Sequence, residues 1–284
     1  MALLSAPILS VIVLLGQTAT DAAADASIRE EQMRFLKEKS AELSLFQHSD
    51  LKTPLPLAAQ PVLRYSNWAG LSSDGAMFLW LAGTRPVAAV SFSLRRPNNA
   101  VYRECTSLWS TPLDCRQDGA SVWSPKKGGL LAQRLKDAPV PAEGNAQRLT
   151  QMRDMAWRFA VTWHHSRTDE PTQLRMLPTP LYRFAAEKEG ILDGALFAFV
   201  VTNDPEMLLL LEAAREKPSE SAHWRYSFAR MSSLKEVVRL DDEETWTVPH
   251  YHSDPTEDKK TGHYTEQRVG VFVPAAGAPA GDAK

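Results

Sequence analysis

The string His250-Tyr251-His252-Ser253-Asp254 contains the residue types of a metal-binding motif. In an extended chain, alternate side chains point to the same side, so His250, His252 and Asp254 would share one face. Imidazole and carboxylate groups are suitable ligands for Zn, Cu or Ni. The string therefore predicts a candidate metal site. The alternative is a solvated loop, because the sequence defines no further ligand.

Two arginines, Arg64 and Arg183, lie 119 positions apart within apolar segments that are typical of strands. Each is followed by an Asp-Gly pair, at Asp74-Gly75 and Asp193-Gly194, which we interpret as turns before an apolar strand. An arginine in such a place can form a structural ion pair with the nearby Asp. It can also line a groove and bind an anionic ligand, so both arginines are candidate ligand-binding residues.

The chain has two cysteines, Cys105 and Cys115. The intervening Ser110-Thr111-Pro112 could form a turn that brings them opposite each other, and an oxidising compartment would permit a disulfide. Spacing alone does not establish the geometry that a disulfide needs. Two free, buried thiols are the alternative.

Motifs of named catalytic classes are missing from the sequence. It contains no Gly-x-Ser-x-Gly, no His-Glu-x-x-His, no phosphate-binding loop, no dinucleotide fingerprint and no Cys-x-x-Cys. No cofactor is therefore predicted. The net charge of −2 provides no basic field, so nucleic acid is not an expected partner.

The elements that must position these residues follow an internal echo. Residues 32–86 resemble residues 151–205 at the same spacing of 119, and the echo resumes at a spacing of 123 where Trp123 matches Trp246. The pattern predicts helices over about 27–47 and 146–164, each followed by about five short antiparallel strands. Each helix would cover one face of its sheet. The predicted fold class is α+β, with one unit used twice.

The N-terminus is typical of a targeting segment. Residues 2–16 form an apolar run of signal-peptide length, and small residues around Ala24 offer cleavage sites. We expect an exported protein, periplasmic or extracellular, and the alternative is an uncleaved anchor. No later segment is apolar enough to span a membrane.

These observations divide the chain into five parts. They are a signal peptide over 1–24, a first α+β unit over 25–136, a linker over 137–144, a second unit over 145–273 and a disordered tail over 274–284.

The second unit also carries longer strings with a family resemblance. They are Leu174-Arg175-Met176-Leu177-Pro178, Pro180-Leu181-Tyr182-Arg183-Phe184, the run from Asp193 to Val200, Asp204-Pro205-Glu206 and Trp224-Arg225-Tyr226. With these strings the chain resembles a bacterial family of uncharacterised exported proteins across about residues 55–250. The resemblance implies export and a shared architecture, and it implies no activity, ligand or catalytic residue.

The sequence favours a non-catalytic exported binding or protein-interaction module of the cell envelope. Duplicated units commonly leave a cleft between them, where a small ligand or an envelope protein could bind. The alternative is an envelope hydrolase, with or without the assistance of a metal ion, that uses acidic and histidine groups gathered by the fold.

Overall fold

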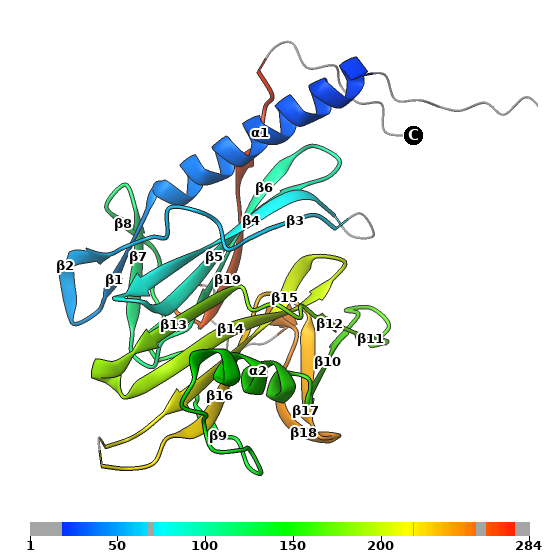
Figure 1. Ribbon diagram of the computed structural model, residues 1–284. Helices are drawn as coiled ribbons and strands as arrows, with labels where there is room; N and C mark the ends of the chain where they lie inside the picture. The colour runs from blue at the N-terminus through cyan, green and yellow to red at the C-terminus, as the bar shows by residue number, and fades with distance from the viewer. Residues whose placement is uncertain (1–18, 68–70, 218, 254–259, 276–284) are drawn as a thin grey trace, which may run out of the picture.

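The computed structural model describes residues 19–67, 71–217, 219–253 and 260–275 (Figure 1). Strand makes up 51% of the structure and helix 14%, and the strands form four antiparallel sheets. The prediction of an α+β fold built from two helix-plus-sheet units is therefore wrong, because the protein is mostly β. Residues 1–18 of the predicted signal peptide and residues 276–284 of the predicted tail lie outside the described residues.

Both helices end earlier than the sequence predicted. Helix α1 spans Ala19–Ala41 and α2 spans Asn145–Ala156. The remaining residues of each predicted helix form a strand instead, β1 (Leu43–Gln47) after α1 and β10 (Phe159–His164) after α2. Short apolar stretches fit helical and strand periodicity almost equally well. Pairing with strands far along the chain decides their conformation here.

Two four-stranded sheets, the outer sheets, have the strand orders β2-β1-β7-β8 and β11-β10-β17-β18. The other strands of the first are β2 (Asp50–Leu55), β7 (Leu113–Gln117) and β8 (Ala120–Trp123). The other strands of the second are β11 (Pro171–Gln173), β17 (Lys235–Leu240) and β18 (Glu243–Val248).

Two larger sheets, the central sheets, have the orders β19-β6-β5-β4-β3 and β12-β14-β15-β16-β9, and β13 also pairs with β14. The strands of the first are β3 (Leu63–Tyr65), β4 (Ser72–Ala82), β5 (Arg85–Arg95), β6 (Ala100–Ser107) and β19 (Tyr264–Val271). The strands of the second are β9 (Gln133–Arg134), β12 (Arg175–Met176), β13 (Tyr182–Ala186), β14 (Ile191–Val201), β15 (Asp204–Ala214) and β16 (His223–Arg230).

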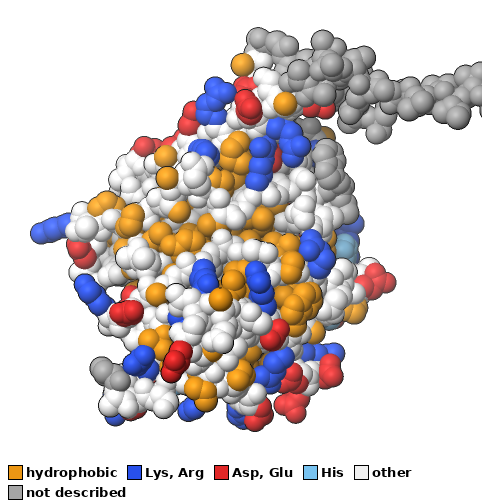
Figure 2. Space-filling view, viewed as in Figure 1, with side chains coloured by type: hydrophobic (Ala, Val, Ile, Leu, Met, Phe, Trp, Pro, Cys, Tyr) orange, Lys and Arg blue, Asp and Glu red, His pale blue; other side chains and the backbone are white. Residues whose placement is uncertain are grey.

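The central sheets face each other, and both faces of each sheet are buried. Met77 on β4 and Leu208 on β15 belong to the apolar core that the two sheets share. On the opposite face of β4, Phe78 packs in a core with Leu36 of α1, and Phe197 of β14 packs with Met152 of α2. We use N-terminal half for the first outer and central sheets with α1, and C-terminal half for the other two sheets with α2. On the face seen in Figure 2, apolar side chains gather in a band between these two halves.

The two halves exchange their edge strands. β9 precedes α2 in the chain yet pairs with β16 of the C-terminal half. β19 follows the last strand of the C-terminal half and returns to pair with β6. Each central sheet is therefore completed by a segment that the sequence assigned to the other unit.

The two Asp-Gly pairs lie inside long strands rather than in turns. Gly75 is in β4 opposite Tyr65, and Gly194 is in β14 opposite Phe184. A Cβ atom at either glycine would lie 2.4 Å from the facing aromatic ring. The glycines are therefore explained by a ring lying across the backbone, and a turn conformation is not required.

We predict that Gly194→Ala lowers the free energy of unfolding by about 1–3 kcal/mol, because the Phe184 ring must move inside a packed core. Urea denaturation measures the change. Gly270→Ala is the matched control, since a Cβ there meets no atom within 4 Å. Equal stability of the two variants would contradict this explanation.

Candidate functional site

The two central sheets meet at a junction, and one end of this junction is polar. It holds a cluster of buried charged side chains that the sequence did not reveal. We call it the junction cluster. Its members are Arg95, Glu104, Asp204, Glu206, Arg230, Glu236 and Glu266. Glu104 on β6 lies directly opposite Ser91 on β5 and Glu266 on β19. Directly paired residues share a face of the sheet, so the two carboxyl groups lie next to each other.

Glu104 is the best-connected carboxyl group of the cluster. The Tyr264 hydroxyl donates a hydrogen bond to its Oε1 atom. Arg95 lies 3.8 Å from its Oε2 atom and forms a 2.6 Å ion pair with Glu266. Burial, together with the charge of Glu266, raises the pKa of Glu104 to about 8. The folded protein therefore favours the protonated form of this side chain at neutral pH.

The C-terminal half contributes three more acids. Burial raises the pKa of Asp204 to about 6, and burial with the charge of Asp204 raises the pKa of Glu206 well above its usual range. Glu236 on β17 is fully buried, and neither carboxyl oxygen has a hydrogen-bond partner among the described residues. Burial raises its pKa well above the ordinary value, and only the charge of Arg230 favours ionisation. An unpaired buried carboxylate is costly, so protonation is the expected response.

Arg230 is held rigidly in the middle of this region. Its guanidinium group donates to the backbone carbonyls of Ser232, Leu234 and Pro249. It also lies 5.2 Å from the centre of the Tyr264 ring. Its donors are therefore used by the protein itself, and it supplies a fixed positive charge.

Protonated carboxyl groups of this kind can act as general acids where a substrate reaches them. The carboxyl groups of the junction cluster line neither the groove nor the large surface pocket described next.

A groove of about 370 Å³ lies beside the cluster, between the two halves. We call it the junction groove. Its lining residues are Thr106, Ser107, Lys127, Gly128, Gly129, Leu131, Phe228, Ala229, Arg230, Trp246, Val248, Pro249 and His263. The rings of Phe228 and Trp246 lie 5.8 Å apart. Lys127, Arg230 and His263 are basic, and the described residues of the lining include no Asp or Glu. The groove thus combines apolar surface with positive charge.

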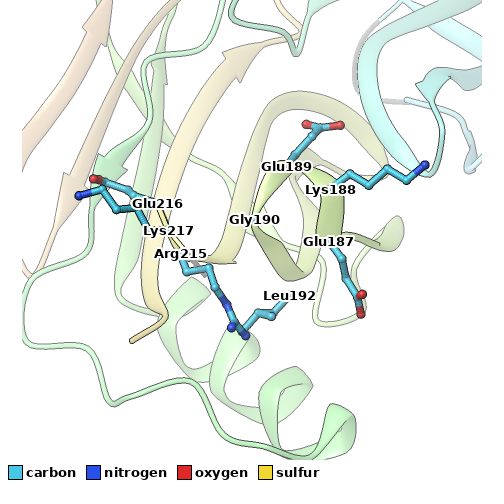
Figure 3. A pocket seen from close by; sticks show the side chains of 8 residues that line it. All are labelled: Glu187, Lys188, Glu189, Gly190, Leu192, Arg215, Glu216 and Lys217. Carbon is cyan, nitrogen blue, oxygen red and sulfur yellow. The ribbon is translucent and has the colours of Figure 1, made fainter. Parts of the chain in front are cut away.

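A larger surface pocket of about 540 Å³ lies between the 3₁₀ turn Glu187–Glu189 and the residues that follow β15 (Figure 3). Its lining mixes acidic and basic side chains. In Figure 3 the charged ends of Lys188, Glu189 and Lys217 point in different directions rather than toward one place. The pocket therefore lacks the convergent polar groups of a binding site.

The predicted metal string does not adopt the extended conformation on which it depended. Tyr251–Ser253 is a 3₁₀ turn. His250 Nδ1 accepts a hydrogen bond from the backbone of Lys235, and His252 Nε2 lies 3.2 Å from Glu266 Oε2. Asp254 lies outside the described residues. Among the residues that are described, no group of three or more His, Cys, Asp or Glu side chains could hold a metal ion.

Arg64 and Arg183 occupy equivalent places in the two central sheets. Arg64 forms a two-point ion pair with Asp74, with atoms 2.5 and 3.0 Å apart, and donates to the backbone carbonyl of Arg29 in α1. Arg183 pairs in the same way with Asp193 and donates to the Asn145 carbonyl in α2. Each arginine therefore tethers a helix to its sheet. Binding of an anionic ligand at Arg64 or Arg183 stays a prediction.

Cys105 on β6 and Cys115 on β7 lie in the same buried core and are free thiols, so the structure contains no disulfide between them. Burial raises the pKa of Cys105 to about 11 and the pKa of Cys115 well above its usual range. Both groups are therefore kept as protonated thiols.

Comparison of the chain with protein-family models, with curated proteins and with solved structures finds no match. The resemblance to a family of exported proteins therefore stays a prediction. No helix among the described residues is long and apolar enough to cross a membrane.

We predict that the free energy of unfolding decreases as the pH rises from about 4.5 to 8. The folded pKa of Glu104 lies above its ordinary value of 4.5, so the folded state binds more protons than the unfolded state over this interval. The stabilisation is complete below pH 4.5 and is lost as the pH passes the folded pKa. Each such group contributes at most about 1.4 kcal/mol per pH unit. Urea denaturation at several pH values measures the slope.

Glu104→Gln should make this slope shallower, because the amide has no proton to lose. The groups facing the same region (Arg95, Arg230, Tyr65, Tyr264 and the other acids) remain and keep part of the slope. The control is Glu243→Gln at an exposed position of β18. Identical slopes in the wild type and Glu104→Gln would contradict the assignment.

For the cysteines, we predict that the thiol reagent dithiobis(nitrobenzoate) labels neither thiol in the folded protein. It should label both thiols after denaturation without reductant. The reason is that both thiols are buried and unbonded. Absorbance at the thionitrobenzoate band counts the reactive groups. Failure of denaturation to expose any thiol would show that a disulfide forms.

Proposed function

We propose that this chain is a non-catalytic exported binding protein whose ligand occupies the junction groove. The ligand class that fits is an amphipathic anion, which combines an apolar body with an acidic group. The proposal rests on one observation, the charge of the groove. Lys127, Arg230 and His263 line it, and no Asp or Glu is among the described residues of its lining.

The shape of the groove supports the same conclusion. Phe228 and Trp246 provide aromatic surface, and Gly128 and Gly129 let the lining segment pack closely against the backbone of Ser110 and Ser107. Binding sites of this size typically pair an apolar lining with a few polar groups that orient the ligand. An anionic group would lie near Lys127 and His263, and the apolar part would lie against the aromatic rings.

The hydrolase alternative has less support. The groove contains a hydroxyl and an imidazole, at Ser107 and His263, but the Ser107 hydroxyl hydrogen-bonds to the backbone of Trp109. His263 Nδ1 has no hydrogen-bond partner among the described residues. A nucleophile and its general base must lie within hydrogen-bond reach of each other, and this pair does not meet that condition.

Export is supported by the apolar run over residues 2–16 and by the small residues around Ala24. Ala24 lies within α1, so cleavage there would remove the first residues of that helix and leave Arg29, whose carbonyl accepts from Arg64. The proposal requires a secreted form that begins near Asp25. Mass spectrometry of the periplasmic or extracellular protein tests it.

Anilinonaphthalene sulfonate, an aromatic anion, is a suitable probe for the groove. We predict saturable binding with an increase in its fluorescence, and about ten-fold weaker binding to Lys127→Glu because the variant places a negative charge at the groove. Lys126→Glu is the matched control, since Lys126 is an exposed neighbour outside the groove lining. Equal effects of the two charge reversals, or no saturable binding, would contradict the proposed function.

A further inference from the structure

The two central sheets differ in how their edge strands are covered. β6 is paired by β19 from Ala100 to Thr106. The equivalent strand of the second sheet is β16, and β9 pairs with only two of its residues, Arg225 and Tyr226. Within the described ranges no other strand pairs with this edge of β16. The segment Phe228–Arg230 therefore lies at a sheet edge without a strand partner.

The hydrogen-bond pattern shows which backbone groups point to this edge. Trp224 accepts a bond from the Leu135 N–H at the edge, whereas the Met231 N–H donates in the opposite direction to Glu206 on β15. Bonding direction alternates along an antiparallel strand. The N–H and C=O groups of Phe228 and Arg230 therefore point to the uncovered edge of β16. In the other central sheet, the N–H of Ser107 on β6 points to the edge that β19 covers and donates to the His263 carbonyl.

The junction groove lies along this uncovered edge. Phe228, Ala229 and Arg230 of β16 line it, and so do Lys127, Gly128, Gly129 and Leu131 from the segment before β9. The segment just before β9 does not continue along β16, because the N–H groups of Gly129 and Leu130 donate to the Trp109 carbonyl instead. This departure leaves an open space next to β16. In the other central sheet, β19 fills the matching space next to β6.

We infer that an extended acidic peptide segment of a partner protein binds in the junction groove and adds to β16 as an antiparallel strand at Phe228–Arg230. This inference rests on the proposed function and names its ligand. Strand addition supplies main-chain hydrogen bonds, and alternate side chains supply specificity. The peptide residue opposite Phe228 shares a face with the Phe228 and Trp246 rings and is apolar. Acidic residues flank it in the peptide, because Lys127 and His263 also line the groove and no Asp or Glu is among the described residues of its lining.

The test uses a fluorescein-labelled peptide of alternating Glu and Val residues and the full-length mature protein. A residue opposite Phe228 uses both its N–H and its C=O toward β16. N-methylation of the Val amides should therefore weaken binding at least about ten-fold, and N-methylation of the Glu amides should change it less than about three-fold. Both methylated peptides carry the same local conformational restriction, so each serves as the control of the other. Fluorescence anisotropy measures the affinities.

Two surface variants locate the binding site. Leu131 lines the groove and is 81% exposed, and Val140 lies outside the groove lining and is 77% exposed. Leu131→Asp should weaken peptide binding at least about ten-fold, and Val140→Asp should leave it unchanged. Since both side chains are largely exposed, neither change should unfold the protein, and circular dichroism verifies this.

The outcomes separate the inference from the proposed function. Equal binding of the two methylated peptides would overturn strand addition. Saturable binding of anilinonaphthalene sulfonate without peptide binding would overturn the peptide inference and leave the proposed function standing, whereas loss of both would overturn the proposed function as well. Self-association that Leu131→Asp abolishes would identify a second copy of the chain as the occupant and overturn the inferred partner.

Discussion

Burial of both faces of the two central sheets is the constraint on which the rest of the structure depends. Each sheet shares one face with the other sheet and gives its second face to a helix and an outer sheet. A single helix is too narrow to cover five or six strands, so the four-stranded outer sheets cover the remainder. Strands that are buried on both sides need nearly continuous apolar sequence, as in β14 and β15. The protein is mostly β for this reason, despite the two helices among its described residues.

The polar end of the junction has a different role from the apolar core. Carboxyl groups from both halves meet there around Arg95 and Arg230, so the pKa values of these groups depend on how the halves are arranged. Burial favours protonated acids, which links the stability of the junction to pH. The neighbouring groove has a basic and apolar lining, with no acid among the described residues that form it. The two regions are adjacent but chemically distinct.

The exchanged edge strands connect the fold to the proposed function. β19 completes the sheet of the N-terminal half, and the short β9 only begins to complete the other. An uncovered strand edge is a liability that proteins normally protect. In this protein the uncovered edge of β16 lies in a groove rather than on an open surface. The same exchange also ties the halves together, because each sheet includes a strand from elsewhere in the chain.

The sequence by itself determined the local features. Hydrophobic runs and turn residues predicted the long strands of both central sheets, and the common spacing of Arg64 and Asp74 with Arg183 and Asp193 indicated the two ion pairs. The tertiary structure decided that β1 and β10 are strands, that the cysteines are unbonded and that His250 and His252 lie at a 3₁₀ turn. The junction cluster also depends on the tertiary structure, because Glu104, Asp204 and Glu236 come from distant segments of the chain. Periodicity and turn chemistry act over a few residues, whereas strand partners and clusters of buried charge depend on contacts between residues far apart in the chain.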